Sequence, residues 1–462
     1  METLQRTANR GSISTGGYEI DNSLKFEADN SEYLSRTPSS AGNRKTWTFS
    51  GWVKRTEIGS GGNTILSAGD TYIQFDGNAL QINFRAASEN FFIITNRLFR
   101  DTSAWYHIVV QCDTTQGTAS NRAKVWVNGV QETSFSTSTY DNMSQNYDTL
   151  MNSTNEHEVG KYSNEETTYA NFFNGYIAEL HLVDGTALTP TSFGEFDDDS
   201  GIWKPKAYTG SYGTNGFYLD FENASSLGAD SSGNGNNFTP TNITSADQAT
   251  DTPTNNFCTL NQVMLTQANT VISQGATSLF STGASGNTVV GTIGVSRGKW
   301  YWEFKDINHG GTAYWPAIGY TSSESTDSTQ TAGGGSGYPS HVALLPNGGT
   351  FSNGTIFSGK FNTFSPNDIA GVALDMDNGN MYLYKNGTIQ NSGNPIFTSI
   401  GDFAMPVGSV YLNLCGGYFN FGGFTSYTPA SPASDENGYG TFEYAPPSGY
   451  YALCTKNLAE YG

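Results

Sequence analysis

Apolar and polar residues alternate along this chain in short runs, and turn-forming residues separate the runs. Strict alternation puts one face of a segment in a core and the other in solvent, which is typical of strands in antiparallel sheets. Such runs recur about every ten residues, the spacing of a sandwich or jelly roll. The first of them are residues 24–26, 47–53, 64–66, 72–75 and 80–84.

Two distant segments repeat one order of elements: a strand, a polar or acidic loop, a second strand and an Asn-Gly pair. Asn-Gly supplies the positive φ angles of a tight type I′ turn. Each copy therefore predicts a three-stranded antiparallel meander, and two copies predict two sandwich domains. The copies are residues 105–130, with the turn at Asn128-Gly129, and residues 369–387, with the turn at Asn386-Gly387.

The fold class expected is all-β, with two antiparallel β-sandwich (jelly-roll) domains in tandem. Prolines exclude a central strand from the C-terminal tail, which we expect to pack on a domain surface. A short helix is expected at residues 190–196 and none longer than about one turn elsewhere. The expected division is an N-terminal arm 1–20, a sandwich 21–222, a connector 223–284, a second sandwich 285–424 and the tail 425–462.

Composition narrows the classes of partner. Charged residues make up 14% of the 462 residues, well below the roughly 25% of an average soluble protein, so the surface is largely Ser, Thr, Asn and Gly. The formal charge of −20 argues against nucleic acid and against an anionic membrane surface as partners. No apolar run is long enough to span a bilayer, and the N-terminus lacks the pattern of a secretory signal. Neutral polar surfaces suit extracellular or virion proteins. Because no secretory signal is seen, we expect a protein of a virus particle.

The four cysteines have no regular spacing, which favours four reduced thiols over a disulfide framework or a zinc site. They are Cys112, Cys258, Cys415 and Cys454.

Four pieces of the first half, taken in order, resemble the laminin-G-like branch of the concanavalin A-type lectin and glucanase fold, over about residues 22–205. They are residues 43–55, 105–109, 125–129 and 174–180. The second half resembles a SPRY domain over about residues 285–424. That resemblance rests on residues 298–304, 317–320, 368–375, 384–387 and 418–422. Both families imply antiparallel two-sheet sandwiches.

The whole arrangement, with the connector 251–257, resembles virion structural proteins of tailed phages, especially marine ones. The resemblance implies a non-enzymatic protein on the particle surface, as a tail fibre, appendage or capsid decoration, attached to other virion proteins and oligomeric there. Host-surface glycans are the expected ligand. Two alternatives stay open: an architectural protein without a sugar ligand, and a glycan-degrading enzyme of the same fold.

Catalytic candidates are few. Glucanases of the lectin fold carry a Glu-x-Asp-x-x-Glu strand, and the nearest run here, residues 195–200, has Ser200 at the last position and follows Pro190 and Gly194 in an expected loop. A solvated acidic turn is therefore the favoured interpretation. Two of the five histidines lie on expected core strands, where imidazole usually packs beside a hydrogen-bond partner. No catalytic residue is expected.

No cofactor is expected, with calcium as the one candidate. Residues Asp230, Ser232 and Asn234 place oxygen atoms at alternate positions before Gly235, as in the first half of an EF-hand loop. The twelfth position, which needs a glutamate, is Thr241. A series of hydrogen-bonded Asx turns is the alternative.

Ligand binding is expected from aromatic residues on loops of the second half: Tyr314, Trp315 and Tyr338. Flat aromatic rings stack on the apolar faces of sugars, and neighbouring polar residues bond the hydroxyls. The alternative is that these rings pack a sandwich edge. Trp47, Trp52, Trp126, Trp300 and Trp302 alternate within strands and are assigned to cores.

Overall fold

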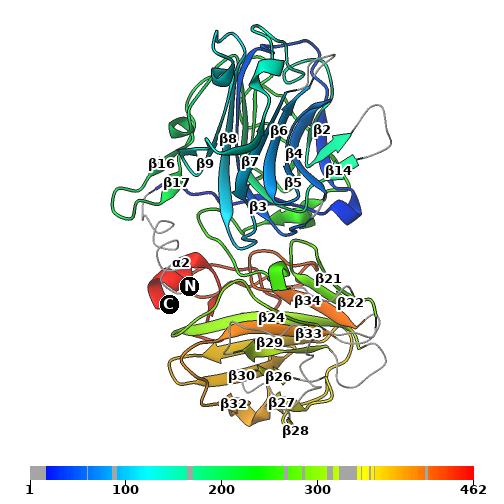
Figure 1. Ribbon diagram of the computed structural model, residues 1–462. Helices are drawn as coiled ribbons and strands as arrows, with labels where there is room; N and C mark the ends of the chain where they lie inside the picture. Colours follow the sequence, from blue (N-terminus) through cyan, green and yellow to red (C-terminus); the bar gives the residue numbers. More distant parts are fainter. Residues whose placement is uncertain are drawn as a thin grey trace. The chain divides into compact units, whose positions relative to one another are not determined.

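The chain divides into two compact units, Met1–Thr254 and Asn255–Gly462. Each is an antiparallel β-sandwich, which confirms the predicted fold class (Figure 1). The structure is a computed structural model. It describes residues 17–59, 61–85, 91–163, 170–264, 269–283, 287–309, 316–321, 341–344, 346–352, 355–357, 359–410 and 415–462.

The first unit has two sheets of eight strands each among its described residues. One sheet has the order β10-β9-β8-β3-β15-β1-β20, with β18 beside β15. Its strands are β10 (Val130–Gln131), β9 (Ala123–Val127), β8 (Trp105–Asp113), β3 (Thr46–Arg55), β15 (Gly175–Asp184), β1 (Ser23–Phe26), β20 (Gln248–Ala249) and β18 (Phe217–Leu219).

The other sheet of this unit has the order β11-β7-β6-β5-β4-β12-β2-β19. Its strands are β11 (Phe135–Ser138), β7 (Phe92–Leu98), β6 (Ala79–Phe84), β5 (Thr71–Asp76), β4 (Gly62–Ala68), β12 (His157–Val159), β2 (Tyr33–Arg36) and β19 (Thr239–Thr241). Two small hairpins lie outside the sheets: β13 (Lys161–Ser163) with β14 (Ala170–Phe172), and β16 (Gly194–Phe196) with β17 (Trp203–Pro205).

The core of the first unit lies between its two sheets. Phe49 and Ile108 of the first sheet pack with Ile73 and Ile82 of the second, and all four are fully buried. The outer face of the first sheet is covered too, because Trp126 and Val183 pack there with Phe193 and Tyr212 of the segment after β15. This sheet is therefore buried on both faces, which explains the long unbroken burial of β3 and β15. All five tryptophans assigned to cores are buried.

The second unit has one sheet of nine described strands and one of six. The larger sheet has the order β21-β22-β34-β24-β29-β30-β31, with β32 beside β30 and β35 beside β24. Its strands are β21 (Thr270–Ser273), β22 (Ser278–Ser281), β34 (Gly416–Asn420), β24 (Lys299–Asn308), β29 (Ile369–Asp375), β30 (Asn380–Lys385), β31 (Thr388–Ile389), β32 (Phe397–Thr398) and β35 (Tyr451–Ala452). The smaller sheet consists of β23 (Asn287–Val290), β33 (Met405–Val410), β25 (Ala317–Thr321), β26 (His341–Leu344), β27 (Thr350–Ser352) and β28 (Thr355–Phe357).

Both predicted meanders are confirmed, as β8-β9-β10 and β29-β30-β31. Their turns have the conformation that Asn-Gly favours, with φ angles of 49° and 77° at Asn128 and Gly129 and of 47° and 76° at Asn386 and Gly387. Two consecutive residues with positive φ are the hallmark of the type I′ turn.

The segment expected to be a connector, 223–284, is divided between the units instead. β19 pairs with β2 and β20 with β1, so residues up to 254 complete the first sandwich. β21 and β22 extend the larger sheet of the second unit through β34. These strands are too short to show a periodic apolar pattern, so the pattern did not predict them. Ion pairs and side-chain hydrogen bonds contribute much of what holds the segment to the first unit.

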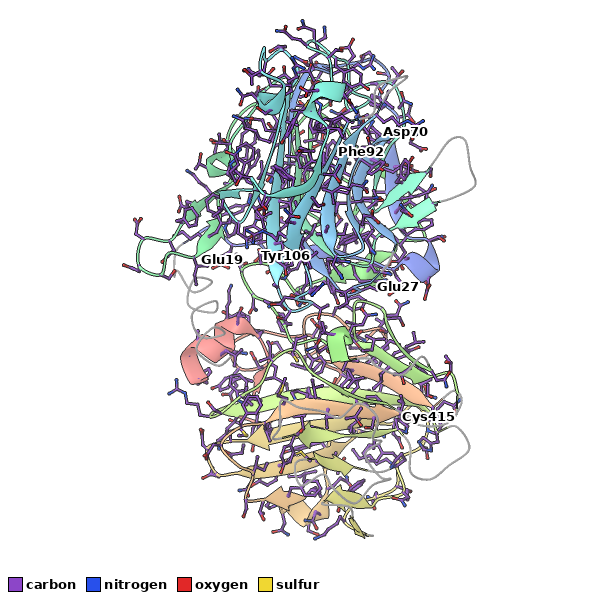
Figure 2. All side chains as sticks on the ribbon, in the orientation of Figure 1. Glu19, Glu27, Asp70, Phe92, Tyr106 and Cys415 are labelled. Carbon is purple, nitrogen blue, oxygen red and sulfur yellow. The ribbon has the colours of Figure 1, made fainter. Side chains whose placement is uncertain are left out.

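Buried lysines hold the end of the first unit to its sheet. Lys25 bonds both carboxylate oxygens of Glu32 at 2.9 Å and contacts Asp247 at 2.7 Å. Lys54, fully buried, contacts Asp251 at 2.6 Å. Both lysines lie near the C-terminal ends of β1 and β3. Figure 2 labels Glu27 and Tyr106 at the same end of this sheet. A buried ammonium needs such a counterion, so residues 247–251 are part of this domain.

The C-terminal tail, 425–462, was expected to pack on a domain surface, but part of it enters the sheet and the core of the second unit. β35 runs parallel to β24, and Leu453 enters the main core. The tail ends in α2 (Thr455–Tyr461), a helix of seven residues, longer than the single turn expected. The short helix expected at 190–196 is a 3-10 turn, Pro190–Ser192.

All four cysteines are free and buried, and burial raises the pKa of Cys112 well above its usual value and that of Cys454 to about 12. Among the described residues, no helix has the length and apolar character needed to cross a membrane.

Candidate functional site

The aromatic residues expected to bind a ligand, Tyr314, Trp315 and Tyr338, lie outside the described residues. Trp315 directly precedes Pro316, which is described and leads into β25 of the smaller sheet. The role of these three rings stays a prediction.

In the loop considered for calcium, backbone N–H groups donate hydrogen bonds to side-chain oxygens that could otherwise bind the ion. Oδ1 of Asp230 accepts the backbone N–H groups of Tyr218 and Ser232 at 2.9 Å each, and Oδ2 accepts that of Asn236 at 2.8 Å. The hydroxyl of Ser232 accepts the backbone N–H of Asn234 at 3.2 Å. These contacts have the form of the Asx-turn series that the sequence offers as the alternative. Calcium binding here stays a prediction.

The acidic run nearest to a glucanase motif lies on the hairpin β16–β17. The carboxylate of Glu195 is half exposed and contacts Lys204 at 3.5 Å. Asp197 begins the turn, where its Oδ1 accepts both the backbone N–H and the hydroxyl of Ser200 at 2.9 Å. These bonds lower the pKa of Asp197 to about 2. A carboxyl group with so low a pKa is ionised at neutral pH, so Asp197 is not suited to donate a proton as a general acid.

His107 and Ser50 form a buried pair that resembles half of a nucleophilic triad. The two side chains are 2.8 Å apart, between His107 Nε2 and Ser50 Oγ. However, the indole N–H of Trp203 donates to His107 Nδ1 at 3.0 Å, so the imidazole proton resides on Nε2 and faces the hydroxyl. Burial lowers the pKa of His107 to about 3. This imidazole has no lone pair free to take the serine proton, so the pair is structural.

Glu179 is the residue that sequence reasoning missed. It lies in β15 with a φ of 50°, where the register against β3 shifts between Ala178 and His181. The shift is a β-bulge, which re-aims side chains on the strand. A left-handed conformation costs a residue with a side chain about 1 kcal/mol or more. The bulge brings Glu179 beside His181, with 3.6 Å between Oε2 and Nε2.

Two phenols donate hydrogen bonds to the carboxylate of Glu179, which is 5% exposed. Tyr218 donates to Oε1 at 2.7 Å and Tyr18 donates to Oε2 at 2.8 Å. Burial and the charge of Glu179 raise the pKa of both phenols, so they remain protonated donors. His181 stacks on Tyr218 with 4.4 Å between ring centroids, and its Nδ1 lies 2.9 Å from the hydroxyl of Tyr212. The cluster joins four chain segments on the outer face of the sheet.

Glu303 of β24 is the corresponding buried carboxylate of the second unit. Oε1 accepts the hydroxyl of Tyr301 at 3.1 Å and the backbone N–H of Tyr444 at 2.9 Å. Oε2 accepts the backbone N–H of Glu443 at 2.8 Å and the hydroxyl of Tyr427 at 3.1 Å. Burial raises the pKa of Glu303, while these bonds act in the opposite direction. The carboxylate binds the tail to the larger sheet.

Across the described residues, no three His, Cys, Asp or Glu side chains gather in a group that could hold a metal ion. The carboxylates and imidazoles that the two folds do bring together are held by donors of the same unit. Their arrangement fixes chain segments to the sheets.

Comparison with known proteins supports part of this organisation. No curated protein matches the chain significantly. Among solved structures, the chain is similar to the crystal structure of the SPRY domain of human HERC1, with 17% identical residues and a TM-score of 0.27, over 32% of this chain and 89% of that domain. Residues 28–192 match the family model of the concanavalin A-like lectin/glucanases superfamily. The first unit thus contains a concanavalin A-like domain, of a superfamily that includes both lectins and glucanases.

Proposed function

We propose that this protein is a non-enzymatic structural protein of a phage virion surface, in a tail fibre, an appendage or a capsid decoration. In this role it attaches the particle to glycans of the host surface. Its partners are other virion proteins, and it is oligomeric within the particle. The proposal follows from the two tandem sandwiches, from the chemistry of the surface and from the state of the buried ionisable groups.

The observation that carries the binding role is that the ionisable groups on the central strands are engaged structurally. Glu179 and Glu303 each accept hydrogen bonds at both carboxylate oxygens. The lone pair of His107 is occupied by Trp203. General acid–base or nucleophilic catalysis requires a group that exchanges a proton with substrate during the reaction. These three groups support strands, so loops and faces remain as the functional surfaces.

The surface chemistry favours neutral, hydroxyl-rich ligands. With 14% charged residues, most surface positions offer hydroxyls, amides and glycine, which suit hydrogen bonds with sugar hydroxyls. The net charge of −20 limits nonspecific adhesion to anionic cells. Many copies on one particle multiply weak contacts, so about millimolar affinity per sandwich is enough for adhesion by avidity.

A glycan array with the intact protein tests the sugar ligand. We expect binding to a restricted set of glycans that is lost in Trp315→Ala and kept in Phe196→Ala. Phe196 is the matched control because its ring is 49% exposed and it lies on the hairpin of the first unit. Equal loss of glycan binding in both variants would contradict a binding site in the second unit. If the intact protein binds no glycan on the array, the architectural alternative is favoured. Repeating the array with a chelator and with Asp230→Asn tests the calcium candidate.

The place on a particle is tested separately. Mass spectrometry of purified particles, followed by labelling with an antibody against the chain, is expected to find it as a surface component. Its absence from particles would refute the virion role whatever the array shows.

A glycan-degrading activity is the second candidate, because the superfamily matched by residues 28–192 includes glucanases. A polysaccharide panel assayed for new reducing ends is expected to remain unchanged. Release of reducing ends that Glu195→Gln or Glu179→Gln abolishes would replace the binding proposal by an enzymatic one.

A further inference from the structure

Three ionisable side chains meet in the first unit, on the face of β1 that is opposite the core. Leu24 and Phe26 of β1 belong to the core, so alternation along the strand puts Lys25 on the other face. Its Nζ lies 2.9 Å from each carboxylate oxygen of Glu32 and 2.7 Å from Oδ1 of Asp247. Lys25 and Glu32 are at most 1% exposed, and Asp247 is 8% exposed. One ammonium and two carboxylates therefore share a site that is nearly closed to water.

The two carboxylates are held in different ways. Both oxygens of Glu32 face the ammonium, and each accepts a further donor: the side-chain amide of Asn30 at 2.9 Å and the backbone N–H of Glu27 at 2.8 Å. Asp247 contacts the ammonium through Oδ1. Its Oδ2 accepts the backbone N–H of Thr244 at 2.8 Å and the hydroxyl of the same residue at 3.2 Å. Asp247 therefore has one oxygen beside the amine and the other oxygen held by two donors.

A buried ammonium and a carboxylate in contact are the reactants of an amide bond. Water favours the two separate charges, but burial removes most of that solvation, and a neutral amide has no charge to desolvate. Holding two groups in contact also replaces a bimolecular encounter, and good alignment corresponds to an effective concentration of about 10⁵–10⁸ M. The site therefore favours condensation far more than free solution does.

The neighbours of the pair supply what the condensation needs. When an amine adds to a carboxyl carbon, negative charge develops on the oxygen that stays, and donors aimed at that oxygen lower the barrier. The two donors of Thr244 have this position at Oδ2 of Asp247. Burial raises the pKa of Glu32, whereas the charge of Lys25 lowers it. A carboxyl group that is balanced in this way and touches Nζ is suited to take a proton from the amine and to pass it on.

We propose that Lys25 and Asp247 form an intramolecular isopeptide bond, with Glu32 as the proton relay. The bond between Nζ and Cγ of Asp247 forms, and the bond between Cγ and Oδ1 breaks. The ammonium loses two protons, one directly to Oδ1 and one by way of Glu32, and Oδ1 leaves with both as water. Atoms and electrons balance without an oxidant or a reductant, and Glu32 ends in the state in which it began. The product ties β1 covalently to η5 (Ser245–Asp247), the turn that precedes β20.

Mass spectrometry of the denatured full chain tests the bond. We expect its intact mass to be lower, by one water molecule, than that of the same chain without the bond. A tryptic digest should contain a branched peptide in which Lys25 is joined to Asp247, and cleavage after Lys25 should be lost. A succinimide formed at an Asp-Gly pair also loses one water, but it leaves a linear peptide, so the digest distinguishes the two products.

Two variants separate the roles of the carboxylates. Glu32→Gln keeps the size of the side chain and removes the acid, so we expect at least tenfold less of the branched peptide in freshly purified chain. Asp247→Ala removes the carbon that is attacked, so the full mass is expected. Asp29→Asn, at an exposed carboxylate of the neighbouring turn η1 (Ala28–Asn30), is the matched control and should lose water as the parent does.

The digest of the parent chain needs no substitution, and so it decides the question even if a change in this buried site disturbs folding. A parent of full mass that trypsin cuts after Lys25 would overturn the proposal and leave a structural ion pair. A branched peptide joined through Glu32 would overturn the assignment to Asp247. In a folded Glu32→Gln protein, an unchanged yield of the branched peptide would exclude Glu32 as the proton relay.

Discussion

Tyr18 and Glu179 stand 161 positions apart in the sequence, and the phenol of the first donates a hydrogen bond of 2.8 Å to the carboxylate of the second. Tyr18 lies within the expected N-terminal arm, residues 1–20, and so does Ile20, whose backbone N–H donates to the hydroxyl of Thr254 at 3.1 Å. The two contacts hold the beginning of the described chain to the central strand and to the last residue of the same unit.

Tyr18→Phe removes one donor from a carboxylate that is nearly inaccessible to water. Hydrogen bonds to charged groups contribute about 1.5–3 kcal/mol. Because Tyr18 is only half-buried, we expect the free energy of unfolding to fall by about 1.5 kcal/mol. Urea denaturation followed by tryptophan fluorescence measures it. Tyr208→Phe is the control, because its hydroxyl donates to a neutral, exposed carbonyl, that of Ser211. Equal losses in the two variants would show that the charge of Glu179 does not matter.

Two buried histidines should make the first unit sensitive to acid. Burial lowers the pKa of His107 to about 3 and that of His157 to about 4, below the usual 6.5. Below pH 6.5 the unfolded chain binds protons at these positions and the folded chain does not, so stability falls as the pH falls. At pH 5.0 each histidine is expected to reduce the free energy of unfolding by about 2 kcal/mol relative to pH 7.5.

The raised pKa of Glu32 acts in the opposite sense, because its protonation in the folded state favours folding as the pH falls through that pKa. NMR separates the contributions. The imidazole signals of His107 and His157 should stay constant between pH 7.5 and 5.0 in the folded protein. A signal from either ring that titrates near pH 6.5 would contradict the buried, neutral assignment.

Glu303→Gln should loosen the tail of the second unit. The change replaces one acceptor oxygen by an NH₂ group, which faces the backbone N–H of either Glu443 or Tyr444, so about 3 kcal/mol of stability should be lost. Hydrogen exchange at the amides of these two residues should accelerate, and proteolysis within 425–450 should become faster. Glu443→Gln is the control, since its carboxylate accepts one exposed backbone N–H, from Ala430. Unchanged exchange in Glu303→Gln would exclude the carboxylate as the anchor.

Gly129→Ala tests the packing of the first hairpin turn. A Cβ at Gly129 would lie 2.3 Å from Cε3 of Trp203, in addition to the strain of a φ of 77°. Gly438, with a φ of 81° and nothing within 4 Å of its Cβ position, isolates the backbone strain. We expect a loss of about 1 kcal/mol for Gly438→Ala and about 3 kcal/mol for Gly129→Ala. A shift in tryptophan emission confined to Gly129→Ala would confirm the displacement of Trp203.

The meanders were predictable because Asn128-Gly129 and Asn386-Gly387 specify their turns locally. The strands β19 and β20 were not, since each has at most three residues and their segment is held in part by partners such as Lys25, more than 200 positions away. Local pattern carries no information about such pairing.

The same limit applies to the carboxylates. Glu179 occurs within a run that reads as a buried strand, but its left-handed conformation arises from the register against β3, which sequence alternation does not reveal. An acid inside an apolar strand does signal a buried partner, so this residue could have been singled out without its geometry. Glu303 carries the same signal in β24.

The pair formed by Lys54 and Asp251 sets the limits of any recombinant fragment of the first unit. A truncation at residue 222, where an apolar pattern suggests a boundary, deletes the counterion at 2.6 Å and leaves an inaccessible ammonium, at a cost of several kcal/mol. A fragment ending at residue 254 retains Asp247 and Asp251 and also Thr254, which bonds Ile20, and so we expect it to yield a soluble, crystallisable sandwich.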